Sequence, residues 1–258
     1  MSDDDSRGLE IPDTIDEPHD NHTQSEPARG DATRETPIGV DIGEYNLYTL
    51  CAVDGQSAYE VSGEEICADL DTLRSQTAHL LASRYDRETV ATYVQQRHDA
   101  ILERIDAAAH ECCRYASRYD GPLFVTEDSH YRPRLWNWLV GPDAHRGTTW
   151  LLSIAHLRLR AVAAEYAIPL STVPVEYSSQ ECHACGVLGE RILNTTLECR
   201  NPNCYVDRVA ADHNASLVLA KRYYPGRCCV YRPSHSLRTD DQPSTDTQPT
   251  RADACSLE

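Results

Sequence analysis

Four cysteines in two close pairs restrict how residues 182 to 204 can fold. Cys182 and Cys185 form a Cys-x2-Cys pair, and after thirteen intervening residues Cys199 and Cys204 form a Cys-x4-Cys pair. Four thiolates complete the tetrahedral shell of a structural Zn2+ ion, whereas a catalytic zinc keeps an open position. We therefore predict one structural zinc at these cysteines, against the alternative of ordinary buried or free thiols.

The other cysteines lack this spacing. The chain has eleven cysteines, an odd number, and no apolar leader segment at its N-terminus. These features favour reduced thiols in a soluble, cytoplasmic protein over a disulfide framework. Cys51 and Cys112 lie in apolar surroundings and are expected in the core, whereas the spacing of Cys228 and Cys229 indicates no role.

The charge balance is strongly acidic. One lysine, Lys221, and 23 arginines face 41 acidic residues, which gives a formal charge of -17. Such a composition is typical of a high-salt cytoplasm, because at about 1 M salt the screening length falls to about 3 Å and carboxylates repel one another little. The acidity therefore does not exclude a nucleic-acid partner, but such binding must then depend on local arginines.

The composition divides the chain into a body and two tails. Residues 1–36 and 233–258 are rich in Asp, Ser, Thr and Pro without apolar periodicity, so we expect disordered tails. The predicted body has a first part at residues 37–177, a zinc ribbon at 178–208 and a final helix within 209–232.

The body alternates strand and helix patterns. Residues 38–61 contain short β-rich runs separated by Gly43-Glu44 and Asp54-Gly55, which predicts a three-stranded antiparallel meander. Further elements are expected in the following order: a helical region at 69–118, a strand at 121–128, a helix at 148–167, a strand at 168–175 and a helix at 211–224. This order indicates a mixed α/β fold with helices packed on a sheet.

Three acids occupy unusual positions in these elements. Asp41 interrupts an apolar strand, Glu127 ends another, and Asp212 opens the last helix. If the two strands are neighbours, the acids meet at one end of the sheet, where hard oxygen ligands suit two Mg2+ or Mn2+ ions for phosphodiester cleavage. The alternative for each acid is a cap, a turn or a solvated strand end; Asp212 in particular can simply cap its helix.

Five short segments resemble the TnpB (OrfB-type) transposon-encoded family. "GVDIGEYNL", "FVTED" and "ADHNAS" are similar to its three catalytic motifs, "YSSQECHACG" to the approach to its first zinc knuckle, and the second cysteine pair follows in the same order. The resemblance covers residues 37 to 224. It implies an RNase H-like, RuvC-like nuclease with an inserted zinc ribbon.

The resemblance also implies roles and ligands. Asp41, Glu127 and Asp212 correspond to metal-binding catalytic acids, and the four cysteines correspond to zinc ligands. The family acts on DNA and is guided by RNA, so DNA and a guide RNA are the implied partners, with transposition as the setting. An alternative from another class is a nucleic-acid-binding or regulatory relic that does not use its metal site, and a third is a protein-interaction role.

The sequence departs from the family pattern in three places. A 36-residue acidic segment precedes the first motif in place of wedge and recognition modules, the helical region is not arginine-rich, and the second knuckle is Cys-x4-Cys instead of Cys-x2-Cys. The first two departures concern guide-RNA holding and target recognition. The third alters only a turn.

Arginines and aromatic residues follow the second motif. Arg132 and Arg134, with Tyr131, Trp136 and Trp138, are candidates for contacts to phosphates and bases. A solvated loop whose tryptophans enter the core is the alternative. We expect His213, next to Asp212, to be a surface residue and not a metal ligand.

Overall fold

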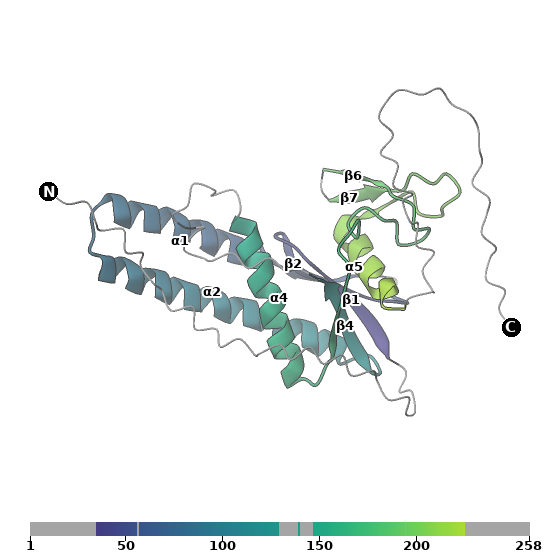
Figure 1. Cartoon of the computed structure of the whole chain (residues 1–258), viewed down its shortest axis with the longest axis horizontal. Helices are drawn as coiled ribbons and strands as arrows, with labels where there is room; N and C mark the ends of the chain where they lie inside the picture. The colour runs from purple at the N-terminus through teal and green to yellow at the C-terminus, as the bar shows by residue number, and fades with distance from the viewer. Residues whose placement is uncertain (1–34, 56, 129–138, 140–146, 194, 225–258) are drawn as a thin grey trace, which may run out of the picture.

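A five-stranded sheet forms the centre of the protein (Figure 1). The computed structural model describes residues 35–128, 139 and 147–224, except 56 and 194. The strand order is β3-β2-β1-β4-β5. The strands are β1 (Thr36–Ile42), β2 (Asn46–Ala52), β3 (Tyr59–Ser62), β4 (Pro122–Glu127) and β5 (Leu170–Val173). The first three strands are antiparallel and β1, β4 and β5 are parallel, so the predicted meander and mixed α/β fold are confirmed.

Three helices lie on one side of this sheet: α1 (Glu64–Ala82), α2 (Arg87–Ala116) and α4 (Gly147–Glu165). Helices α2 and α4 contact the strands, and α1 packs against α2. The apolar residues of α2 that the sequence places on one face, from Val90 to Cys112, are buried against α1, α4 and the strands. Tyr48 of β2 donates a hydrogen bond from its hydroxyl to the Ala155 carbonyl of α4 (2.8 Å), which satisfies a buried polar group at this contact.

The single helical region expected at 69–118 is two helices. The chain leaves the helical conformation at Ser83 and re-enters it after Asp86, whose side chain accepts a hydrogen bond from the Thr89 amide (2.9 Å) as an N-cap. The two helices lie side by side and project away from the sheet (Figure 1). The described part of the chain contains no helix long and apolar enough to cross a membrane.

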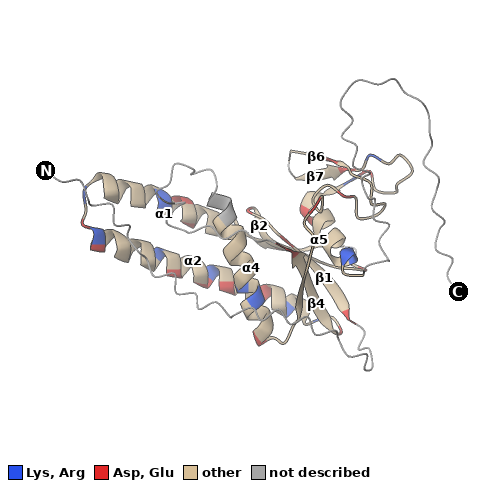
Figure 2. Ribbon diagram, in the orientation of Figure 1, with Lys and Arg blue, Asp and Glu red and all other residues tan. Residues whose placement is uncertain are grey.

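Charges of both signs line the paired helices α1 and α2 (Figure 2). Arg104 of α2 pairs with Asp69 (3.0 Å) and Glu65 (2.5 Å) of α1, and Arg97 also approaches Asp69 (3.7 Å). Exposed pairs of this kind stabilise a fold by at most about 1 kcal/mol each. Arg97 and Arg104 therefore serve contacts between the two helices.

Helix α5 (Ala211–Arg222) packs on the opposite face of the sheet, directly over β1. A Cβ atom on Gly39 of β1 would lie 1.7 Å from the Ser216 carbonyl oxygen and 2.7 Å from the Ala220 amide nitrogen. Only glycine permits this approach of helix backbone to strand backbone. Leu123, Val125 and Leu219 complete the apolar contact between the sheet and α5.

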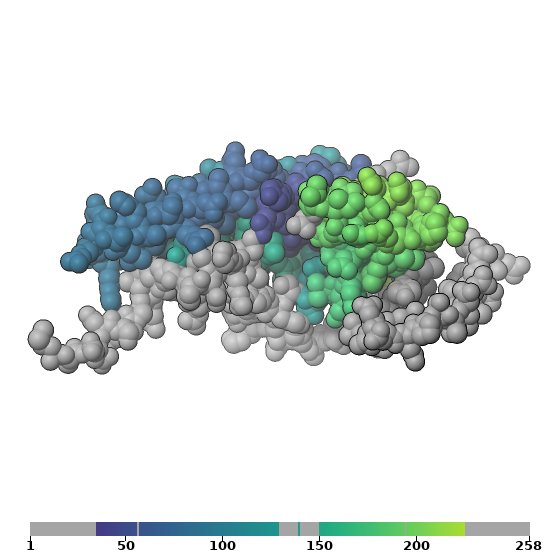
Figure 3. Space-filling view, turned by 90° about the horizontal axis from the view of Figure 1, so that it is seen from above, coloured from purple at the N-terminus to yellow at the C-terminus, as the bar shows by residue number. Residues whose placement is uncertain are grey.

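A second, small antiparallel sheet lies beside α5. Its strands are β6 (Glu190–Ile192), β7 (Thr196–Glu198) and β8 (Arg208–Ala210), and α5 follows β8 without a break. We define the cysteine ribbon as residues 178–210, which contain this sheet and the four paired cysteines. The space-filling view shows the cysteine ribbon and α5 together at one end of the molecule, with α1 and α2 at the other (Figure 3).

Replacing Gly39 by alanine should therefore destabilise the protein strongly. The added methyl group overlaps the α5 backbone, and the helix must move away from β1, so we expect a loss of about 3 kcal/mol or more in the free energy of unfolding. Urea unfolding followed by circular dichroism measures this. Gly55→Ala is the matched control, because its Cβ would lie no closer than 3.0 Å to any neighbour; equal stability of the two variants would contradict the proposed role of this contact.

Candidate functional site

The pairing register brings two of the three predicted acids together. In the parallel pair β1 and β4, Gly39 lies opposite Val125. Side chains alternate along a strand, so two residues further Asp41 and Glu127 point to the same face as Gly39. That face is the one covered by α5. Both acids stand at the carboxyl ends of their strands, at one edge of the sheet.

The third acid, Asp212, reaches this edge from the first turn of α5. The N-cap of α5 is Ala210, so Asp212 lies inside the helix and is not its cap. Asn46, at the start of β2, donates from Nδ2 to Asp212 Oδ2 (3.2 Å), and Arg191 of the cysteine ribbon has its guanidinium 3.9 Å from Oδ1. Three separate parts of the chain therefore meet at this carboxylate.

Glu127 is held by the beginning of the cysteine ribbon. The buried Ser178 donates a hydrogen bond from its hydroxyl to Glu127 Oε1. Ser178 belongs to the "YSSQEC" segment that precedes the first cysteine pair. A hydrogen bond to a charged oxygen orients it more strongly than a neutral one does.

Burial and the neighbouring carboxylates alter the ionisation of Asp41. Burial, followed by the charges of Asp212 and Glu127, raises the pKa of Asp41 to about 8, and the Arg191 guanidinium opposes this shift. Buried like charges disfavour ionisation, because each carboxylate loses water and meets the field of the others. We call Asp41, Glu127 and Asp212 the acid group.

The carboxylates of the acid group approach each other without converging on a single point. Among groups of three or more His, Cys, Asp or Glu side chains in the described residues, only the four paired cysteines bring all their ligand atoms within 4.8 Å of one another. Glu127 is drawn toward Ser178, and Asp212 toward Asn46 and Arg191. The arrangement concentrates negative charge at the sheet edge, where oxygen ligands favour hard divalent cations.

His213 is only partly at the surface, contrary to expectation. It is half-buried, and its Nε2 atom is buried without a hydrogen-bond partner among the described residues. Its ring is nearly parallel to that of His183 in the cysteine ribbon, with 6.3 Å between centroids. Burial lowers the pKa of His213, so the ring packs as a neutral group between α5 and the ribbon.

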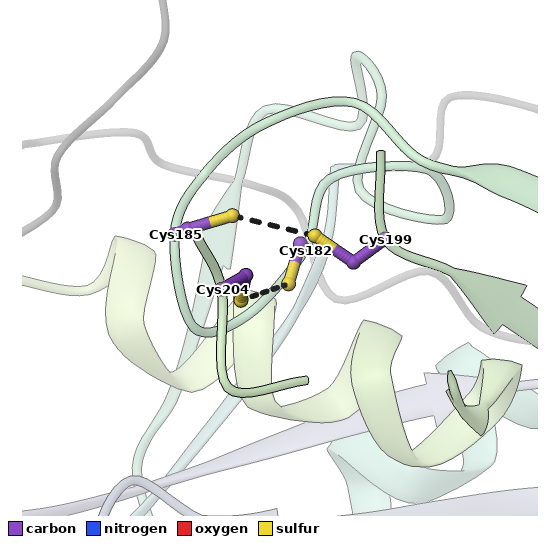
Figure 4. Close-up of side chains that lie close together, drawn as sticks. All are labelled: Cys182, Cys185, Cys199 and Cys204. Atoms are coloured by element: carbon purple, nitrogen blue, oxygen red, sulfur yellow. Dashed lines mark hydrogen bonds between the residues drawn. The ribbon is translucent and has the colours of Figure 1, made fainter. Parts of the chain in front are cut away.

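The four cysteines converge as predicted (Figure 4). The Cys182 and Cys204 sulfurs are 3.9 Å apart and those of Cys185 and Cys199 are 3.5 Å apart. A tetrahedral Zn–S distance of about 2.3 Å requires sulfurs about 3.8 Å apart, so the four thiols fit a metal ion such as zinc. The Asn201 and Val206 amides donate to the Cys199 and Cys204 sulfurs, which suits thiolate ligands.

A set of buried polar contacts ties the cysteine ribbon to α5. The fully buried Asn214 accepts a hydrogen bond at Oδ1 from the His183 amide (2.9 Å) and donates from Nδ2 to the Glu181 carbonyl (2.7 Å). About two turns further along α5, Lys221 donates to the His183 carbonyl (2.6 Å), and Arg222 pairs with the Glu181 carboxylate (2.7 Å). Residues 181–183, which include the first cysteine, are thus fixed to the helix that carries Asp212.

Sequence reasoning missed Asn46, Ser178 and Arg191. Asn46 lies in the "GVDIGEYNL" segment and Ser178 in the "YSSQECHACG" segment, so both carried a signal, whereas Arg191 lies in neither. Asn214 carried a signal, because it lies in the "ADHNAS" motif beside Asp212. Arg132 and Arg134 lie outside the described residues, as do Tyr131, Trp136, Trp138, the Cys228-Cys229 pair and the predicted tails except residues 35 and 36. β1 begins at Thr36, the last residue of the predicted N-terminal tail.

Comparisons with known proteins match this architecture. Residues 156–219, which run from α4 through the cysteine ribbon to α5, match the family described as Cas12f1-like, TNB domain. This match supports the predicted resemblance to the TnpB-like family. No curated protein shows significant sequence similarity to the chain.

Two solved structures share the fold of this TnpB-like protein. A Cas12f1–sgRNA–target DNA complex matches with a TM-score of 0.57 and 15% identity over 73% of this chain and 50% of that chain. A CRISPR-Cas12f ternary complex matches with a TM-score of 0.53 and 15% identity over 72% of this chain and 38% of that chain. The chain thus spans half the length, or less, of the proteins whose fold it shares.

The cysteine cluster predicts a defined metal content. Purified protein should hold about one zinc per chain, and Cys199→Ser or Cys204→Ser should reduce this toward zero, because three ligands hold a structural metal poorly. Elemental analysis by mass spectrometry measures the content. Cys67→Ser is the control, since this free thiol lies outside the cluster. A native content near zero would contradict the predicted zinc site.

The contact between ribbon and helix predicts a large effect at Asn214. Asn214→Ala leaves the His183 amide and the Glu181 carbonyl without their buried partner, so we expect a loss of about 2 to 4 kcal/mol in the free energy of unfolding. Thermal or urea unfolding of zinc-loaded protein measures it. Asn203→Ala is the control, because Asn203 is exposed in the same ribbon. Equal stability of both variants would show that Asn214 does not join the two parts.

Proposed function

We propose that the protein is a metal-dependent endonuclease that cleaves DNA at the acid group. The observation that carries this proposal is geometric: the register of β1 and β4 puts Asp41 and Glu127 on the sheet face that α5 covers, and Asp212 stands in the first turn of α5. Burying carboxylates side by side destabilises a fold, and such perturbed groups cluster at functional sites. The negative charge of the carboxylates attracts divalent cations, and a bound cation relieves the repulsion between the carboxylates.

In this proposal the three acids are the catalytic residues and hold two Mg2+ or Mn2+ ions. Bound cations of this kind activate a water molecule and neutralise the charge that develops on the phosphate oxygens. Asn46 and Ser178 fix the orientations of Asp212 and Glu127 through their hydrogen bonds. Arg191 adds a positive charge at the same edge, where it can contact the scissile phosphate.

Zinc in the cysteine cluster has a structural role in this proposal. Four sulfur ligands leave no position for a substrate. The metal instead keeps the ribbon folded, and the folded ribbon presents Ser178 and Arg191 to the acid group. Zinc therefore supports cleavage without taking part in it.

The relatives support nucleic acid as the ligand. The Cas12f1 structure that shares this fold is a complex with an sgRNA and target DNA. We propose DNA as the substrate of this chain, in line with the family motifs. A guide RNA is the second ligand to test, by sequencing any RNA that co-purifies with the protein.

Replacing Asp41 or Glu127, the two acids on the sheet, should strongly lower the rate of DNA cleavage. With Mg2+ or Mn2+ in high salt, native protein should cut labelled single- or double-stranded DNA, and Asp41→Ala and Glu127→Ala should each lower the rate by roughly 100-fold or more, because a ligand of the cations is lost. Gel electrophoresis of the products measures this. The control is Asp99→Ala, which removes an exposed acid on α2.

Cation binding provides a second readout of the same proposal. Titration with Mn2+ by electron paramagnetic resonance should show tight sites in the native protein and in Asp99→Ala, and weaker sites in Asp41→Ala. Cleavage that survives both acid substitutions would contradict the proposed centre. Mn2+ bound without cleavage would favour a binding or regulatory protein.

A further inference from the structure

Two exposed tyrosines stand beside the residues that hold the acid group. Tyr45 is 76% exposed and directly precedes Asn46, which donates to Asp212. Tyr177 is 51% exposed and directly precedes Ser178, which donates to Glu127. Large aromatic rings in such positions are left in water by the fold, so their apolar faces are free for a ligand.

Both tyrosines are located on the edge of the sheet where the acids lie. Tyr45 is in the turn between β1 and β2, and Tyr177 follows the carboxyl end of β5. The sheet order β2-β1-β4-β5 puts the strands of Asp41 and Glu127 between them. With strands about 4.8 Å apart, the two tyrosines flank the acid group at a separation of roughly 10 to 15 Å.

The backbone at each tyrosine is fixed although the ring is exposed. The Tyr45 carbonyl accepts a hydrogen bond from the Gly63 amide (2.7 Å), and the Tyr177 carbonyl accepts from the Gln180 and Glu181 amides (2.9 and 2.8 Å). Tyr177 also adopts a left-handed conformation with φ of 59°, which bulky residues rarely take. Strained backbone that is held by its surroundings is common where a side chain must be aimed at a ligand.

We propose that Tyr45 and Tyr177 are binding residues that stack on unpaired bases of a nucleic-acid strand on either side of the acid group. A strand whose phosphate reaches the acids must cross this sheet edge, so its neighbouring bases pass the two rings. Every base has a flat face that can stack on an aromatic ring, whereas in a duplex these faces are already stacked on each other. The tyrosines therefore select an unpaired strand independently of its sequence.

This inference rests on the proposed nuclease function, and binding tests it separately from cleavage. The probe is a fluorescent oligothymidine, with a duplex of the same length for comparison and Ca2+ in place of Mg2+ to limit cleavage. Fluorescence anisotropy gives the dissociation constants. Tyr45→Ala and Tyr177→Ala should each weaken binding of the single strand by about ten-fold, whereas Tyr45→Phe and Tyr177→Phe should stay within about two-fold of native.

Tyr85 offers a matched control. It is 54% exposed, like Tyr177, but lies in the connection between α1 and α2, at the end of these helices that projects away from the sheet (Figure 1). Tyr85→Ala should bind the single strand as native protein does. Duplex binding should change by less than about two-fold in every variant, because paired bases present no free face.

The outcomes separate this inference from the function on which it rests. If the alanine variants bind the oligothymidine as tightly as native protein, the stacking role is overturned. If Asp41→Ala nevertheless loses cleavage, the proposed nuclease function stands. Equal weakening for single strand and duplex, or no binding by native protein, would also overturn it. Unfolding curves that match native protein show that the variants are folded when binding is lost.

Discussion

The contact of α5 with β1 is the constraint on which the rest of the structure depends. Gly39 lets the backbone of the helix lie directly on the backbone of the strand, closer than any residue with a Cβ atom allows. The same helix carries Asp212 toward the sheet and Asn214 toward the cysteine ribbon. A small displacement of α5 therefore moves one acid away from the other two and loosens the ribbon at the same time.

The cysteine ribbon and the acid group form one connected unit. The cysteines fold the ribbon, buried hydrogen bonds from Asn214 and Lys221 fix its first knuckle to α5, and Ser178 and Arg191 extend from it to Glu127 and Asp212. Buried polar networks specify one geometry because each unsatisfied group is destabilising. This explains how the cysteine cluster can influence the acid group without touching it.

The acid group opposes the stability of this fold. Asp41 sits in an apolar strand next to two further carboxylates, and its raised pKa reflects the free energy needed to ionise it there. Arg191, Asn46 and Ser178 offset part of this repulsion. They do so from the ribbon and from the start of β2, so none of the three lies on the strands that carry Asp41 and Glu127.

The sequence by itself determined the helices and strands, the three acids and the four cysteines of the candidate site. Alternating apolar runs specified the meander, the periodicity from Val90 to Cys112 specified the buried face of α2, and the cysteine spacing specified a four-sulfur cluster, because each of these signals is local. Only the tertiary structure decided that Ser178, Arg191 and Asn46 join the acids, that His213 is half-buried, and that residues 69–118 contain two helices. These outcomes depend on strand register and on the docking of α5 on β1, which are contacts between segments far apart in the chain and leave no pattern within any one segment.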